Sequence, residues 1–279
     1  MVPALLLLGV VFLWPWAHYS WLSIHASSLL TGLRAIPNGG ANWQRLVQDG
    51  RFWQDAFQTL RFAGVSVALE LGLGLLTALI LHRPSKGRGV LRALVLIPWA
   101  LPATVMALGW RWILNDPHGP LNALLQALGG GTYPFLASPA TTWWFVVLAD
   151  VWKTTPFVAI ILLAGLQSIP RDLEEALRLE GAGVWSIFRR LQLPLLTPYL
   201  GLALLFRLAQ AFGVFDLIQI LTGGGPAGST ESLASYAYLQ AIRFLDFGYS
   251  ATLMLATFLI LLTLSLLWLG GMRWSGVRR

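Results

Sequence analysis

Six long apolar runs, separated by polar or Gly/Pro-rich breaks, dominate the pattern of residues along the chain. They cover residues 2–24, 59–81, 90–114, 142–167, 195–222 and 248–271. A helix needs about 20 mostly apolar residues to cross the hydrocarbon core of a bilayer. The breaks, such as 83–89 and 222–226, carry the residue types of turns. The pattern predicts an all-α fold, a polytopic bundle with six transmembrane helices that residues 1–279 form as a single domain.

The composition agrees with a chain that faces lipid. Hydrophobic residues make up 56% of the sequence and charged residues 11%, whereas a soluble domain carries about 25% charged residues. The absence of cysteine excludes disulfides and thiol chemistry. The histidines are scattered without the spacing of metal ligands, so no metal site is expected.

Lys and Arg are concentrated in alternate breaks, and this asymmetry predicts the orientation of the bundle. Most of them lie in or beside 83–92, 171–190 and 273–279. Cytoplasmic segments carry the excess of positive charge in membrane proteins, so both termini are expected inside the cell. The placement of these charges is more informative than their net sum of +7, and no nucleic-acid partner is expected.

The first run begins almost at Met1, with no basic residue before it. A cleaved signal peptide is one interpretation, but it lacks a positive n-region and a convincing small-residue cleavage site. A start codon assigned slightly late, or a very short cytoplasmic tail, agrees better with the sequence.

The long cytoplasmic segment 169–198 has its own start and stop signals. Asp172 is expected to cap a helix from Leu173, and Glu175 would complete a capping box. Gly181 is expected to end that helix. A second short helix is expected over about 184–191, ended by Leu193 and Pro194. These signals predict a rigid helix–turn–helix, and the alternative is an ordinary amphipathic connector that lies on the membrane.

Several stretches of this sequence resemble a known family. Glu175-Ala176-Leu177, Gly181-Ala182 and Leu191-Gln192-Leu193-Pro194 resemble the EAA motif of the inner-membrane permeases of bacterial and archaeal ABC importers. Residues 97–102, 152–157, 215–218 and 221–226 resemble the maltose/glycerol-phosphate-type sugar permeases more narrowly. The resemblance covers about 59–267. The chain departs from the motif at Leu177, its third position, and at Glu180, where the family usually has Asp; both keep the helix and the charge.

The resemblance implies a coupling role for this EAA loop (about 169–198). In the family the EAA helices sit in a groove on each cytoplasmic ATPase, and closure of the ATPase dimer moves them. The residues implied in ATPase coupling are Glu174, Glu175, Ala176, Glu180, Gly181, Ala182, Leu193 and Pro194. The implied partners are a second related permease subunit, in a heterodimer, two cytoplasmic ATPase subunits and an extracytoplasmic solute-binding protein. The implied location is the bacterial or archaeal cell (inner) membrane.

The chain lacks the sequence features of an enzyme. A P-loop needs G-x-x-x-x-G-K-[ST], and neither of the two lysines, Lys86 and Lys153, lies in that setting. No Ser-His-Asp arrangement or carboxylate dyad stands out. We therefore expect no cofactor in this chain, with ATP and Mg bound by the partner ATPase.

Ionisable residues inside the apolar runs point to the transport path. Charged groups within membrane helices are costly and usually face the bundle interior or a wet path; here they are Glu70, Asp150, Lys153, Arg207 and Asp216. Helical spacing places Asp150, Thr154 and Phe157 on one face and Arg207, Gln210 and Val214 on another. By motif alignment these positions, with Ala211, resemble those lining the mid-membrane sugar site of maltose-type permeases.

Alternatives remain open for these charges. Asp150 could pair with Lys153, three residues on. Asp150 and Arg207 could bind sugar hydroxyls, or they could neutralise each other across the path. Arg207 also keeps an anionic cargo open.

Two classes of function compete with a sugar importer permease, whose cargo would be a disaccharide, an oligosaccharide or a glycosylated osmolyte. Within the same class, the cargo could be glycerol-3-phosphate or another polyol. In a different class, an ion-coupled secondary transporter would need no ATPase and often shows inverted repeats, of which none is evident. A polytopic membrane enzyme should display a cluster of acidic or His residues, which this sequence lacks.

Overall fold

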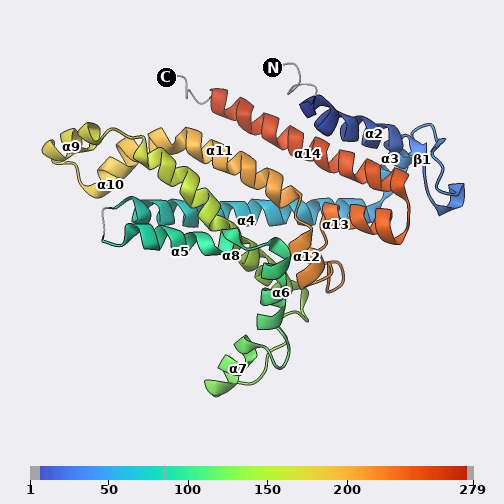
Figure 1. Cartoon of the computed structure of the whole chain (residues 1–279), viewed down its shortest axis with the longest axis horizontal. Helices are drawn as coiled ribbons and strands as arrows, with labels where there is room; N and C mark the ends of the chain where they lie inside the picture. Colours follow the sequence, from blue (N-terminus) through green and yellow to red (C-terminus); the bar gives the residue numbers. More distant parts are fainter. Residues whose placement is uncertain (1–6, 84–85, 275–279) are drawn as a thin grey trace. The chain divides into compact units, whose positions relative to one another are not determined.

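The computed structural model describes residues 7–83 and 86–274 and is predominantly helical (Figure 1). Within these residues, four helices are long and apolar enough to cross a membrane: Gly50–His82, Pro139–Gln167, Val184–Phe212 and Phe247–Gly271. A fifth span results if the bent pair α5 (Arg88–Ala100) and α6 (Ala103–Ile113) counts as one. Of the first predicted run, 2–24, residues 1–6 lie outside the described residues, and η1 (Gly9–Leu13) and α2 (Trp14–Ser23) are helical.

The helix is broken inside two of the predicted runs. The run 90–114 bends by 88° between α5 and α6. Leu101 adopts an extended conformation, and Pro102 follows it and precedes α6. This is expected, because steric clash with proline disfavours the helical conformation of the residue before it. The run 195–222 divides into α11 (Leu193–Phe212) and α12 (Asp216–Leu221). Gly213 follows the last residue of α11, and glycine is a weak helix former.

The contacts divide the chain into two compact units. Unit 2 comprises 61–211 and 216–230. It contains most of α4 (Gly50–His82), then α5, α6, α7 (Pro120–Ala127), α8 (Pro139–Gln167) and the helices that follow up to α12. Only the last residue of α11 lies outside it among these later helices. Its core joins α4, α8 and α11 through buried side chains such as Leu81, Leu162 and Leu196. The sequence makes α8 the central helix, since apolar residues occupy most of its circumference.

Gly74 sets how closely α4 and α8 approach each other. A Cβ at this position would lie 2.6 Å from Cγ1 of Val158 and 2.8 Å from its Cβ, both in α8. Small residues at helix contacts let two backbones approach closely within a membrane. Gly74 lies one turn after Glu70, so this contact also brings Glu70 towards α8.

The EAA loop of the sequence analysis contains α9 (Arg171–Leu179), α10 (Val184–Ile187) and the π-helical turn η3 (Phe188–Gln192). The expected Asp172 cap and its capping box are wrong, because α9 begins two residues before Leu173, with Pro170 at its N-cap and no side-chain cap. Proline has no backbone N–H, so at the N-cap it adds no donor that would need a hydrogen-bond partner. The expected stop at Leu193-Pro194 is also wrong. The helix passes from η3 directly into α11, because the proline lies in a helix that has switched to the wider π turn just before it.

Gly181 ends α9 where the sequence predicts. Its φ of 83° is left-handed, a conformation that glycine adopts without strain. The Gly181 N–H donates to the carbonyl of Arg178 at 3.0 Å, and the Ala182 N–H donates to that of Leu177 at 2.9 Å. This pair of bonds is the Schellman motif, so the turn between α9 and α10 is closed by backbone hydrogen bonds.

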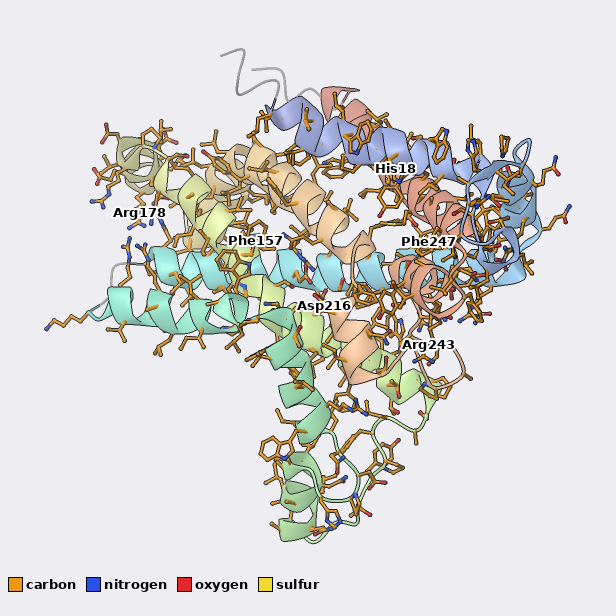
Figure 2. All side chains as sticks on the ribbon, turned by 45° about the vertical axis from the view of Figure 1, so that its right-hand side comes forward. His18, Phe157, Arg178, Asp216, Arg243 and Phe247 are labelled. Carbon is orange, nitrogen blue, oxygen red and sulfur yellow. The ribbon has the colours of Figure 1, made fainter. Side chains whose placement is uncertain are left out.

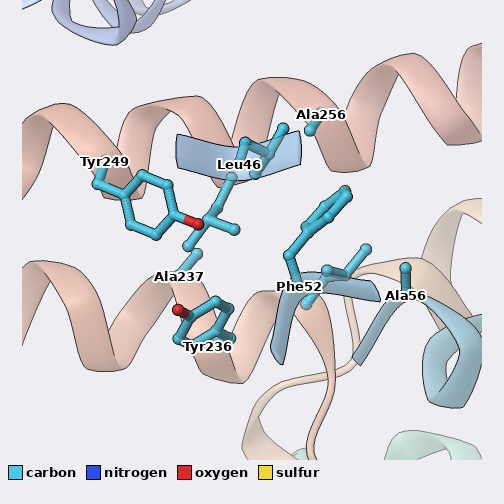
Figure 3. Packing of buried hydrophobic residues seen from close by; sticks show 9 residues of the cluster. Leu46, Phe52, Ala56, Tyr236, Ala237, Tyr249 and Ala256 are labelled. Carbon is cyan, nitrogen blue, oxygen red and sulfur yellow. The ribbon is translucent and has the colours of Figure 1, made fainter. Parts of the chain in front are cut away.

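Unit 1 comprises the described parts of 1–60, 212–215 and 231–279. It contains η1, α2, a two-residue antiparallel strand pair of β1 (His25–Ala26) and β2 (Ile36–Pro37), η2 (Leu29–Thr31) and α3 (Ala41–Gln48). It also contains the first turns of α4, then α13 (Leu233–Tyr238), η4 (Leu239–Arg243) and α14 (Phe247–Trp274). Figure 3 shows its core, in which Leu46 of α3, Phe52 of α4, and Tyr236 and Tyr249 of α13 and α14 pack together.

A polar cluster borders that core. The Tyr236 hydroxyl donates to the carboxylate of Asp49 at 2.6 Å, and the Tyr249 hydroxyl donates to the same oxygen. Burial alone would raise the pKa of Asp49, but these hydrogen bonds outweigh it and hold the pKa below its usual value. Arg51 forms a bidentate pair with Glu231, at 2.8 and 3.1 Å. The ends of α4 and α13 are thus joined by charged as well as apolar contacts.

Candidate functional site

A buried ion cluster joins three long helices of unit 2. Arg207 of α11 donates from Nε and Nη2 to the two carboxylate oxygens of Glu70 of α4, the second at 2.8 Å. Its Nη2 also donates to Oδ2 of Asp150 of α8 at 3.0 Å. Glu70 is 0% and Arg207 1% exposed. One guanidinium therefore lies between two carboxylates in the middle of apolar helices.

Neutral side chains complete the cluster. The Thr154 hydroxyl oxygen lies 2.7 Å from Oε1 of Glu70 and 2.6 Å from the backbone carbonyl oxygen of Asp150, and its one hydrogen can be donated to either acceptor. Nη1 of Arg207 donates to Oε1 of Gln210 at 2.6 Å. Gln210 is exposed, unlike the ionised members. The cluster thus reaches the surface of unit 2 at Gln210.

The physical reason for this arrangement is the cost of burying charge. An isolated ion loses several kcal/mol or more of hydration inside a protein, so a buried charge needs both an opposite charge and hydrogen bonds. The planar fork of arginine matches a carboxylate in a bidentate pair, which is the contact with Glu70. Asp150 and Thr154 share a face of α8 because they are one turn apart, and Arg207 and Gln210 share a face of α11.

Most of the residues predicted for the path meet in this cluster. Asp150, Thr154, Arg207 and Gln210 are brought together, and mutual neutralisation of Asp150 and Arg207 is observed. Lys153 instead donates to the carbonyl of Leu101 at 2.6 Å. The remaining predicted residues lie elsewhere.

Phe157 packs among aromatic rings rather than in the ion cluster. It stacks on Trp99 with ring centroids 5.9 Å apart and meets Phe206 edge-on at 6.0 Å. Ala211 is buried on α11. The helical-face prediction for Val214 is wrong, because α11 ends at Phe212 and Val214 lies in the irregular segment after it. Asp216 begins α12 and is exposed.

Glu70 is the member that the predicted site set omitted. The signal that identifies it is its position as an ionisable residue within an apolar run. Nothing in the order of residues along the chain pairs one helix with another, so its partners follow only from the packing of α4 on α8.

The predicted coupling residues lie on and after α9. Glu175, Ala176, Glu180, Gly181 and Pro194 are exposed, and Ala182 and Leu193 are half-buried. Glu174 accepts a hydrogen bond from Nε2 of Gln192 at 2.7 Å and lies near Arg178, whose side chain projects from α9 (Figure 2). Glu174 therefore ties α9 to η3, whereas Glu175 is free to meet another surface.

Three large apolar residues on the same surface are not among the predicted coupling residues. Leu179, Val184 and Trp185 are 90%, 74% and 71% exposed, respectively. They flank the Gly181 turn, where the sequence also places charged residues. An exposed apolar patch with a charged rim is typical of an interaction site.

The site offers no metal centre. Within 7–83 and 86–274, no group of three or more His, Cys, Asp or Glu residues could hold a metal ion. Hydrogen bonds and ion pairs join the members of the ion cluster.

Comparison with known proteins finds one family and close relatives. The family model described as "Binding-protein-dependent transport system inner membrane component" matches residues 70–276. A trehalose/maltose transport system permease protein of Thermococcus litoralis is 40% identical over 96% of this chain and 90% of that protein. A sulfoquinovosyl glycerol transport system permease protein of Agrobacterium fabrum is 36% identical over 92% of this chain and 84% of that protein.

A solved structure is similar in fold. It is a chain of a bacterial alginate ABC transporter in complex with an alginate pentasaccharide-bound periplasmic protein. The TM-score is 0.83 over 96% of this chain and 90% of that chain, with 20% sequence identity.

Proposed function

The chain belongs to the family of binding-protein-dependent transport system inner membrane components, and from this premise we propose that it forms half of the path by which an ATP-driven importer moves a sugar across the membrane. Members of this family are transport subunits and not enzymes. The energy for import therefore comes from nucleotide bound by a separate ATPase. The proposed cargo is a disaccharide of the trehalose or maltose kind, on the strength of the relative from Thermococcus litoralis.

The observation that carries the proposal is the ion cluster of Glu70, Asp150 and Arg207, which reaches the surface of unit 2 at Gln210. Polar groups within membrane helices are costly and typically mark a substrate path. A sugar offers hydroxyl groups and C–H faces. The amide of Gln210 and the carboxylate of Asp150 suit the hydroxyls, and the rings of Phe157 and Trp99 suit the C–H faces.

The proposed topology has six spans with both termini in the cytoplasm. The first span includes η1 and α2, the bent pair of α5 and α6 is the third, and α11 is the fifth. The excess of Lys and Arg in alternate breaks supports this orientation. It places α9 and α10 on the cytoplasmic side.

The surface of α9 and α10 is the proposed docking site for the ATPase. It combines two exposed carboxylates, Glu175 and Glu180, with the exposed apolar residues Leu179 and Trp185. A docked surface of this kind buries its apolar centre and leaves charges at the rim. The complete importer contains a second related permease, two ATPase subunits that hold ATP and Mg, and an extracytoplasmic binding protein.

Reconstituted uptake tests this function. The chain is co-purified with its partner permease and ATPase, placed in liposomes, and supplied with the binding protein and labelled trehalose or maltose. The expected result is sugar uptake that requires ATP on the side of the liposome membrane where the ATPase lies. This uptake should disappear with an ATPase variant that cannot hydrolyse ATP. Uptake by this chain alone, driven by an ion gradient without ATP, would show a secondary transporter instead.

A further inference from the structure

The hydrogen bonds of Arg207 determine which charge the cargo can carry. A guanidinium has five N–H donors and no acceptor. Nε donates to Glu70, Nη2 donates to Glu70 and Asp150, and Nη1 donates to Gln210. Only one N–H, on Nη1, is left over. A carboxylate, sulfonate or phosphate bound as a bidentate partner needs two parallel N–H groups, and Arg207 cannot supply them without leaving Glu70 or Asp150.

The charge of the cluster points the same way. With both carboxylates ionised, Glu70, Asp150 and Arg207 together carry one net negative charge. If one carboxylate holds a proton, the cluster is neutral. In neither state does it present a net positive charge to a molecule that reaches Gln210.

Three other cations of the same unit, Lys153, Arg111 and Arg61, already have partners. Nζ of Lys153 lies 2.6 Å from the carbonyl oxygen of Leu101. Nη1 of Arg111 donates to the carbonyl of Ile220 at 3.3 Å, and the guanidinium of Arg61 lies 4.0 Å from the ring centre of Trp143. Each of these groups would have to give up its present contact before it could meet an anion.

We propose that the mid-membrane site of this chain accepts uncharged sugars and excludes sugars that carry a carboxylate, sulfonate or phosphate. This inference rests on the proposed function and assigns its substrate class. Arg207 acts as a positioning residue: it neutralises Glu70 and orients the Gln210 amide through Oε1, so that the amide nitrogen faces away from Arg207 towards an incoming hydroxyl. An anion entering this place would find no free pair of N–H groups on Arg207. With both carboxylates ionised it would also meet an excess negative charge in a medium of low dielectric constant, where like charges repel strongly.

Direct binding to the assembled permease tests the proposal. The full chain, with its partner permease and ATPase, is placed in nanodiscs without the binding protein, so that the selectivity of that protein does not enter. Calorimetry then compares trehalose, trehalose 6-phosphate and 6-O-acetyltrehalose, the last being an uncharged probe with a similar added group. We expect the phosphate to bind at least about tenfold more weakly than the acetyl derivative, as like-charge juxtaposition demands.

A matched pair of variants assigns the effect to the cluster. Asp150→Asn keeps the shape of the side chain and removes the excess negative charge. The ratio between the affinities for 6-O-acetyltrehalose and trehalose 6-phosphate should therefore shrink by about tenfold. Asp172→Asn makes the same change on the exposed start of α9 and should leave the difference unaltered. Equal binding of phosphate and acetyl probes by the unaltered chain would overturn the proposal, as would an undiminished difference in a folded Asp150→Asn protein. Failure of trehalose, maltose and both derivatives to bind would instead overturn the proposed function.

Discussion

Replacing Gly181 with alanine is expected to lower ATP-driven sugar uptake by about fivefold to thirtyfold while the chain still inserts and binds its partner permease. The φ of Gly181 is 83°, where a Cβ costs about 1–2 kcal/mol. That cost displaces the turn between α9 and α10, and 1–2 kcal/mol corresponds to roughly a five- to thirtyfold change in population. Uptake and sugar-stimulated ATP hydrolysis in the same liposomes measure the effect.

Gly183 provides the matched control. A Cβ at Gly181 or at Gly183 would meet no atom within 4 Å, so neither substitution fills occupied space. Gly183 has a φ of −72°, which alanine adopts freely, and Gly183→Ala should retain most of the uptake. Gly181→Asn should lie between the two, because asparagine tolerates the left-handed region. Equal uptake by the Gly181 and Gly183 alanine variants would show that the conformation of the turn does not matter for coupling.

Replacing Arg207 with methionine is expected to destabilise the chain by about 3–5 kcal/mol, the usual cost of removing one partner of a buried ion pair. The substitution leaves Glu70 and Asp150 facing each other without a counter-charge, and both are buried. Thermal unfolding of the purified protein, together with the yield of monodisperse material, measures the loss.

Two further variants separate charge from volume. Combining Arg207→Met with Glu70→Gln and Asp150→Asn removes all three charges, and it should restore much of the thermal stability but not the sugar uptake. Arg178→Met removes an arginine whose side chain is 67% exposed and whose ion pair with Glu174 spans 3.9 Å; it should change stability little. If Arg207→Met melts like the unaltered chain, the cluster does not hold the three helices together.

The apolar runs predict where helices occur better than where they break. Hydropathy stays high across Leu101 and Pro102, so the run 90–114 looks continuous. The dihedral restriction that proline imposes on the residue before it turns the chain by 88° there. The same holds at Gly213, where one residue without a side chain ends α11 inside an apolar run. A local backbone preference overrides an apolar pattern that spans many residues.

Spacing within one helix was sufficient to predict four of the five members of the ion cluster. Asp150 with Thr154, and Arg207 with Gln210, each share a helix face, and those faces meet in the structure. The meeting with Glu70 depends on the close approach of α4 and α8 at Gly74, which no periodicity reports. The failed prediction for Val214 has the opposite cause, since helical spacing was extended past the end of the helix.

The exposed patch of Leu179, Val184 and Trp185 could not be found by periodicity either. In the sequence these residues look like the buried sides of two short helices. The Gly181 turn instead leaves them on the surface. Their exposure is a property of the isolated chain and is the strongest structural support for a partner on this surface.

The central claim is that Gln210 faces the path of a sugar, and cysteine labelling tests it most directly. The chain contains no cysteine, so Gln210→Cys introduces a single thiol, and Leu202→Cys on the exposed side of the same helix serves as control. In the reconstituted importer we expect a charged, membrane-impermeant thiol reagent to modify position 210 at a rate that changes with the nucleotide state and falls when trehalose or maltose is added, while position 202 responds to neither sugar. If position 210 stays unmodified in every nucleotide state, or reacts at the same rate with and without sugar, the sugar does not pass this site.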